Sequence, residues 1–99
     1  MKRAAFIFLA PQTDPSVHRG TVKTPTMDLD AIAVPTYAEA ARVAKDLVDQ
    51  GLGIIELCGG FGIRGTYVVK QAVGDRARIG VVRFDGHPGL DDRSGDELF

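Results

Sequence analysis

The sequence contains a glycine-rich segment whose residue types could bind an anion. Gly59, Gly60 and Gly62 surround Phe61, directly after a short apolar run and before a stretch with helical periodicity. Glycines at the start of a helix let backbone amides approach a phosphate or a carboxylate. The spacing matches neither a dinucleotide-binding loop nor a P-loop. It therefore predicts either a general anion site or a tight strand-to-helix turn in which Phe61 is packed.

Three side chains near this segment could take part in catalysis. Glu56 lies between Ile55 and Leu57 in an apolar run, so its carboxylate must face a polar cleft or pair with a base. Cys58 could be a nucleophile with His87 as its base, although a cysteine at the end of an apolar strand is commonly a small buried hydrophobe. General acid–base chemistry by Glu56 or His87 is the simpler hypothesis, because it requires no activated thiol.

Charged residues also follow the last apolar run. Arg83 is the natural partner of Glu56, either in a structural ion pair or as a clamp for a substrate. Asp85 and His87 flank a glycine and could ligate a divalent metal. We prefer a turn in which both make backbone hydrogen bonds, since no Cys or His pair has the spacing of a zinc site. We expect no metal and no cofactor.

These residues need a sheet to bring them together. Apolar runs predict strands at residues 3–9, 29–34, 53–58 and 77–84, the first of a type covered on both faces. Thr36 and Glu39 have capping-box spacing, which predicts a helix that ends at Gly51. A second helix, with Val68, Val69, Ala72 and Val73 on one side, ends at Gly74. Residues 11–26 are compatible with a short turn or with an antiparallel edge strand at residues 21–23.

The second half of the chain therefore reads strand, helix, strand, helix, strand, which requires right-handed crossovers and parallel strands. We expect one α/β domain over residues 1–99, with a small, open, mainly parallel sheet of four or five strands and two main helices. Residues 86–99 form an extended tail, flexible and solvated from Asp91 to Glu97. Its closing Leu98 and Phe99 could anchor on a neighbouring subunit.

Composition excludes several classes of partner. Lys and Arg number 12 against 13 Asp and Glu, which leaves a net charge of −1 and no basic surface for nucleic acid. The apolar run at residues 4–10 is too short to span a membrane. A single cysteine favours the cytoplasm. Because a chain of 99 residues buries a limited share of its surface, we expect a homo-oligomer.

Four segments carry a resemblance to a known family. They are residues 55–62 (IELCGGFG), residues 82–91 (VRFDGHPGLD), the opening residues 2–8, and Thr13-Asp14-Pro15 before His18-Arg19. They resemble the signature of a bacterial family of small proteins classed as a domain of unknown function. The resemblance covers nearly the whole chain and implies no activity.

Two functions follow from these observations. The first is binding or conversion of a small anionic metabolite at the carboxyl edge of the parallel strands, where ligands of open α/β sheets bind. Glu56 and His87 would be catalytic, with Cys58 as a weaker candidate, and the ligand would contact Gly59, Gly60, Phe61, Gly62, Arg83 and Asp85. The second is a non-enzymatic, self-associating module in which the glycines and Arg83 serve packing. The clustering of polar and glycine residues at strand ends favours the first.

Overall fold

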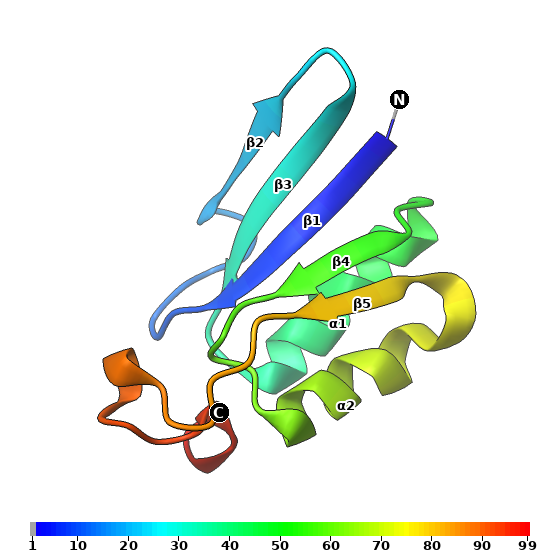
Figure 1. The fold of residues 1–99 in the computed structure, drawn as a ribbon. Helices are drawn as coiled ribbons and strands as arrows, with labels where there is room; N and C mark the ends of the chain where they lie inside the picture. Colours follow the sequence, from blue (N-terminus) through cyan, green and yellow to red (C-terminus); the bar gives the residue numbers. More distant parts are fainter. Residues whose placement is uncertain (1) are drawn as a thin grey trace.

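Five strands form one mixed sheet in the order β2-β3-β1-β4-β5 (Figure 1). Their bounds are β1 (Lys2–Leu9), β2 (Arg19–Lys23), β3 (Met27–Val34), β4 (Ile54–Leu57) and β5 (Arg78–Val81). The computed structural model describes residues 2–99. β1, β3, β4 and β5 are parallel, and β2 runs antiparallel beside β3. The predicted α/β fold with a mainly parallel sheet is confirmed, and residues 21–23 belong to the antiparallel edge strand.

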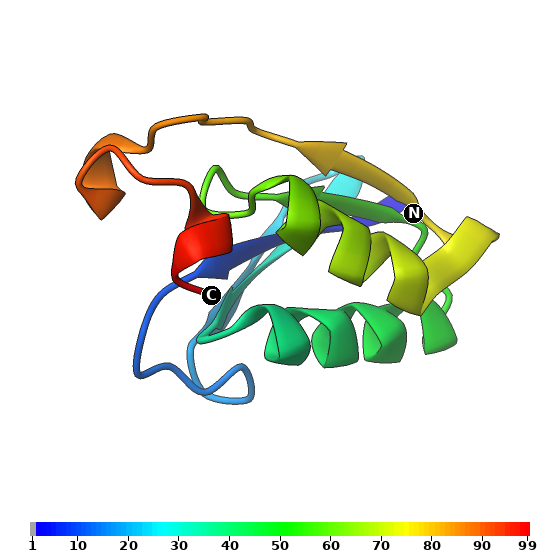
Figure 2. The same ribbon diagram turned by 90° about the horizontal axis from the view of Figure 1, so that it is seen from below.

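Both helices pack on the same face of the sheet (Figure 2). α1 (Tyr37–Asp49) connects β3 to β4 and α2 (Ile63–Val73) connects β4 to β5, followed by a 3-10 turn, η1 (Gly74–Arg76). The two crossovers carry the chain in the same direction across the sheet, so right-handed connections place both helices on one side. None of the helices over residues 2–99 has the length and apolar composition needed to cross a membrane.

The start of α1 follows the predicted cap. Thr36 Oγ1 accepts a hydrogen bond from the Glu39 amide at 3.1 Å. The carboxylate of Glu39 does not return the bond to Thr36 but accepts one from Arg42 Nε at 2.8 Å. The helix therefore begins where the sequence predicts, with one half of the capping box formed.

The prediction that β1 is covered on both faces was wrong. Ala5 and Ile7 are fully buried in the core between sheet and helices, whereas Phe6 and Phe8 on the other face are only half-buried. A strand points alternate side chains to opposite faces. No helix joins β1 to β3, because the β2–β3 hairpin makes that connection. One face of a parallel sheet is therefore left without helices.

The C-terminal segment is ordered against the body of the protein, contrary to the prediction of a flexible, solvated tail. It forms two 3-10 turns, η2 (Pro88–Leu90) and η3 (Gly95–Glu97). Phe99 packs on the core of its own chain, with 6.2 Å between its ring centroid and that of Tyr37. Leu98 is exposed. The terminal aromatic residue is thus already used within the chain.

Candidate functional site

The two segments predicted to form a site emerge from the same edge of the sheet. The carboxyl end of β4 leads into residues 58–62 and that of β5 into residues 82–87 (Figure 1). They also touch, since a Cβ atom on Gly59 would overlap the ring of Phe84. The predicted site requires these strands to be parallel, and they are. Both segments therefore lie at one rim, the carboxyl end of the parallel strands.

A carboxylate of the same chain occupies the start of α2. Asp96 Oδ2 accepts from the Arg64 amide at 3.0 Å, and Oδ1 accepts from the Gly65 amide at 3.1 Å. The Tyr37 hydroxyl donates to Oδ1 at 2.9 Å and accepts from the Gly62 amide at 3.0 Å. A Cβ atom on Gly62 would overlap the Asp96 carboxyl group. In this structure, the anion bound next to the glycine-rich segment is therefore the carboxylate of Asp96 from the same chain.

The protonation states of this pair suit the arrangement. Burial acts to raise the pKa of Asp96, but hydrogen bonds from the Arg64 amide, the Tyr37 hydroxyl and the Gly65 amide outweigh it and hold the pKa below its usual value. Burial raises the pKa of Tyr37 to about 12. Asp96 is thus an anion at neutral pH, and Tyr37 keeps the proton that it donates.

Asp96 was missed by reasoning from the sequence, because an acidic terminal segment was interpreted as solvated. A signal was present, since Ser94 and Glu97 have the spacing of a capping box. The structure forms that box: Asp96 N donates to Ser94 Oγ at 3.1 Å and Ser94 N donates to Glu97 Oε2 at 3.1 Å. Such a box orders a short helical turn, which here positions Asp96.

Cys58 links the ends of two central strands. Its Sγ accepts hydrogen bonds from the Leu9 amide and the Gly60 amide, both at 3.3 Å. Over residues 2–99 no hydrogen bond joins Cys58 to His87. The contacts of Cys58 therefore match the structural interpretation, and the proposed thiol–imidazole pair stays a prediction without a contact to support it.

His87 and Asp85 lie in the turn that follows β5. His87 Nδ1 accepts from the Gly89 amide at 2.9 Å, which agrees with the backbone bonding predicted for it. Asp85 Oδ1 instead accepts from Arg83 Nε at 2.9 Å, and both side chains are largely exposed. In the described part of the chain no group of three His, Cys, Asp or Glu residues could hold a metal ion.

Arg83 does not pair with Glu56, which corrects the predicted ion pair. β5 ends at Val81, so Arg83 lies beyond the last residue that β4 pairs with. Glu56 is in register with Phe6 on β1 and with Gly80 on β5. Because its neighbours Ile55 and Leu57 are fully buried, Glu56 faces the side of the sheet without helices.

Two hollows are lined by four of the nine predicted site residues. One, of about 180 Å³, lies at the rim and is lined by Phe61, Gly62, Ile63, Thr66, Val81, Val82 and Arg83. The other, of about 210 Å³, lies on the open face and is lined by Phe6, Glu56, Leu57, Gly80, Val81 and Val82. The structure thus brings Phe61, Gly62 and Arg83 together and places Glu56 elsewhere. Gly59, Gly60, Phe61 and Gly62 form the strand-to-helix turn, in which Phe61 stacks on Tyr37.

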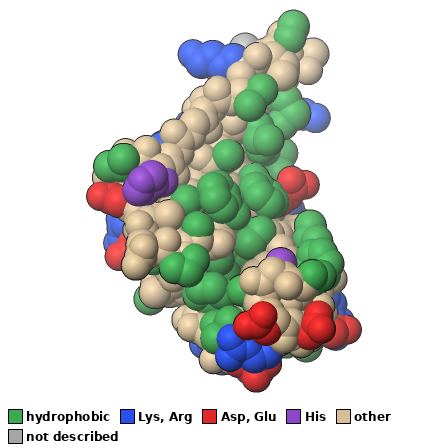
Figure 3. All heavy atoms as spheres, turned by 90° about the vertical axis from the view of Figure 1, so that its left-hand side faces the viewer, with side chains coloured by type: hydrophobic (Ala, Val, Ile, Leu, Met, Phe, Trp, Pro, Cys, Tyr) green, Lys and Arg blue, Asp and Glu red, His purple; other side chains and the backbone are tan. Residues whose placement is uncertain are grey.

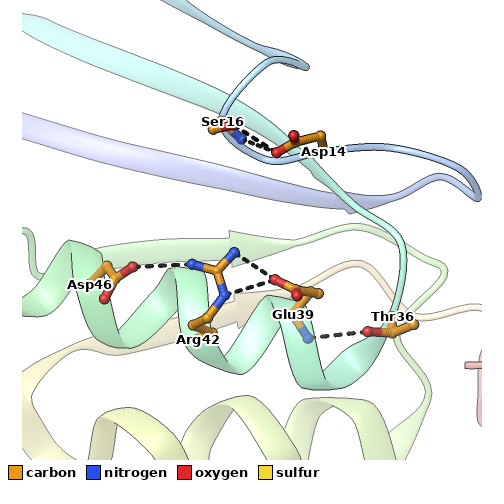
Figure 4. A network of polar contacts seen from close by, with 6 residues as sticks. All are labelled: Asp14, Ser16, Thr36, Glu39, Arg42 and Asp46. Atoms are coloured by element: carbon orange, nitrogen blue, oxygen red, sulfur yellow. Dashed lines mark hydrogen bonds and ion pairs between the residues drawn. The ribbon is translucent and has the colours of Figure 1, made fainter.

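A further polar network lies on α1 and satisfies its own charges (Figure 4). Arg42 pairs with Glu39 and, at 3.5 Å, with Asp46. In the loop between β1 and β2, Asp14 Oδ1 accepts from the amide and hydroxyl of Ser16 at 2.9 and 2.7 Å. Those two bonds lower the pKa of Asp14. The three charged side chains of this network on α1 thus pair with one another, while the Asp14 carboxylate is bound by the neutral Ser16.

One buried acid was also absent from the predicted set. Asp30 is 6% exposed and joins three strands, because its carboxylate accepts from Thr21 Oγ1 at 2.6 Å and from Arg3 Nη2 at 2.9 Å. The Thr21 hydrogen bond, together with Arg3, holds the pKa of Asp30 below its usual value against the effect of burial. All of its contacts are internal, so its role is structural.

The fold and the rim define a class of α/β domain that carries helices on one face of its sheet and caps the start of α2 with its own C-terminal segment. The chain belongs to the family described as "Family of unknown function (DUF6506)", which matches residues 2–97. This confirms the resemblance to a family of small uncharacterised proteins. No curated protein and no solved structure matches the chain.

Proposed function

We propose that the protein is a non-enzymatic module that self-associates through the open face of its sheet. The observation that supports this function is the composition of that face. Alternating strand positions place apolar side chains there from all parts of the sheet: Ala4, Phe6, Phe8, Val22, Met27, Leu29, Ala31, Ala33, Ile54 and, just after β5, Val82. The charged residues at these positions are Lys2 and Arg78, at the starts of their strands, and Glu56.

Parallel sheets are almost always covered on both faces, because their strands bury side chains in both directions. In this chain the open face leaves Val22 61% exposed, Val82 50% and Ile54 42%. Figure 3 shows hydrophobic side chains in a band that begins at the β2–β3 hairpin and continues toward the C-terminal segment. Contiguous exposed apolar surface of this kind supports the proposal of an interface on this face.

A second copy of the chain suits the size of the face. β1 and β3 each have eight residues, so they extend about 26 Å at about 3.3 Å per residue. Five strands about 4.8 Å apart span about 20 Å. The flat area is about 500 Å² before side-chain relief is counted, which is of the order of the about 800 Å² that each partner buries in a stable complex. Two such faces can pack about 10 Å apart as a symmetric dimer.

The test is the oligomeric state of two exposed-face variants, Val22→Asp and Ile54→Asp. We expect wild-type protein to sediment as a dimer of the 10.6 kDa chain and each variant to sediment as a monomer with an unchanged circular dichroism spectrum. The reason is that an unpaired carboxylate buried in an apolar interface costs several kcal/mol, at least about 3. Both side chains are already exposed in the single chain, so the variants can fold alone.

Ile63→Asp is the matched control, because Ile63 is 69% exposed but lies at the start of α2, on the helical side. It should remain a dimer. A wild-type protein that stays monomeric up to millimolar concentration, or Asp variants that stay dimeric, would contradict the proposal.

A second candidate function, binding of a small anion, is favoured by the rim hollow. Its walls are mainly apolar, and Arg83 at its border donates from Nε to Asp85, which leaves guanidinium N–H groups for a ligand. A short branched carboxylate such as isobutyrate fits this chemistry. In an NMR titration with isobutyrate, we expect shifts at residues 62–66 and 81–83 that are lost in Arg83→Gln. Shifts that persist in that variant would count against this function.

A further inference from the structure

The hollow on the open face contains a carboxylate without a partner. Glu56 is exposed between two fully buried neighbours. Over residues 2–99 it forms neither a side-chain hydrogen bond nor a salt bridge. Its strand neighbours are Phe6 on one side and Gly80 on the other. An aromatic ring, a carboxylate and a residue without a side chain therefore lie next to one another on this face.

Gly80 provides the space for the hollow. A Cβ atom at this position would lie 3.6 Å from Glu56 Cγ, so the stem of Glu56 lies beside the bare backbone of β5. The remaining walls come from Leu57, Val81 and Val82. The hollow is thus a notch lined by Phe6, Val82 and the backbone of β4 and β5, with one negative group.

Among the described residues, 2–99, no cation forms a salt bridge with this group. Arg78 shares the face but lies two residues before Gly80, and its Nη1 donates to the Asp75 carbonyl oxygen at 3.5 Å. Lys2 lies four residues before Phe6, about 13 Å away along the strand. Arg83 is paired with Asp85. The charge of Glu56 is therefore available to a ligand.

We propose that this hollow binds a compact organic cation, an alkyl or aryl ammonium. The carboxylate supplies a charge-assisted hydrogen bond to the N–H groups, and the Phe6 ring attracts the same charge through its π face. An apolar cavity of about 150 Å³ accommodates benzene, so about 210 Å³ suits a ligand of about six to eight non-hydrogen atoms. A second copy over the face would bury Glu56, so the bound cation would also offset the cost of burying an unpaired carboxylate there; this part rests on the proposed self-association.

The probe is cyclohexylammonium chloride, and its neutral match is cyclohexanol. In ¹H–¹⁵N NMR titrations we expect the ammonium to shift the amides of residues 6, 56, 57 and 80–82 in a saturable way. Glu56→Gln should weaken binding about tenfold or more, because charge-assisted hydrogen bonds contribute about 1.5–3 kcal/mol. Gly80→Val should abolish binding by filling the notch. Asp75→Asn, which removes an acid outside the hollow, is the control and should bind as wild type does.

The outcomes separate this inference from the proposed function. Equal affinity of wild type and Glu56→Gln, or equal affinity for the ammonium and for cyclohexanol, would overturn it. A monomeric wild type, or the monomeric Val22→Asp variant, that still binds the ammonium through Glu56 would support the site while leaving self-association to its own test. A dimer that shows no saturable shifts would refute the cation site alone.

Discussion

A single carboxylate changes the interpretation of the glycine-rich segment. Asp96 fills the first turn of α2 with two amide hydrogen bonds, and the Tyr37 hydroxyl supports it from the side. A free anion at these amides would have to displace a group that is tethered to the same chain and present at high effective concentration. The start of α2 is thus closed by an internal ligand, and an external anion at the rim would need a cation outside this turn, such as Arg83.

We expect Asp96→Asn to destabilise the protein by about 1–2 kcal/mol, because it removes the charge that caps α2. The pKa of Asp96 is lowered in the folded protein. A lowered pKa contributes stability that is present above the unfolded value, about 3.9, and is lost as the pH falls through the folded pKa. The difference between wild type and Asp96→Asn in urea unfolding should therefore be full at pH 6 and decrease below about pH 4.

Asp75→Asn is the control for this experiment, because the Asp75 carboxylate is fully exposed and lies 3.9 Å from Lys70. Exposed pairs of this kind contribute little, so this variant should unfold as wild type does at a fixed protein concentration. A loss of stability in Asp96→Asn that does not change with pH would show that shape, and not charge, matters at this position.

At the scale of elements, the sequence predicts what local signals encode. Thr36 and Glu39 mark the start of α1, Gly74 ends α2, and the apolar runs give the parallel strands within a few residues. The position of the rim followed from the strand direction. The contacts made at the rim could not be predicted from the sequence, because those between Asp96 and α2 join residues more than thirty positions apart. The uncovered face was missed because a run such as residues 3–9 is apolar on both sides whether or not a helix covers it.

The docking of η3 on the β4–α2 turn depends on a close backbone approach. A Cβ atom on Gly95 would overlap the Gly60 carbonyl oxygen, which is backbone and cannot rotate away. We expect Gly95→Ala to displace η3 and to cost about 1–3 kcal/mol in urea unfolding, with faster proteolysis in residues 91–99. Gly20→Ala on β2 is the matched control, because a Cβ atom there meets nothing within 4 Å. Similar losses in both variants would contradict the tight docking.

For the whole molecule, the strand order explains why one face is open. The parallel strands lie in the order β3-β1-β4-β5. Numbered along the chain, the four parallel strands therefore have the spatial order 2-1-3-4. Doubly wound sheets with this order place a helix between their first two parallel strands, on the face opposite the others. In this chain the antiparallel β2 occupies that connection. The fold is therefore half of a two-sided architecture, and a second copy would supply the missing layer.

This gives a prediction for stability that differs from the test of mass. If the folded unit is a dimer, mass action makes its melting temperature rise with protein concentration. Each residue contributes about 2.1 cal/mol/K to the entropy of unfolding, so for two chains a tenfold increase in concentration should raise the midpoint by about 3 °C. Differential scanning calorimetry of the protein at its starting concentration and after 10-fold and 100-fold dilution measures this shift of the midpoint directly.

The Val22→Asp variant provides the comparison, because it removes the apolar contact and leaves the core between sheet and helices intact. Its midpoint should be lower than that of wild type at high concentration and should not change on dilution. Ile63→Asp should keep the wild-type dependence, since its side chain lies on the helical layer. A wild-type midpoint that is the same at every concentration would mean that each chain unfolds alone, and the open face would then be stable in water without a second copy.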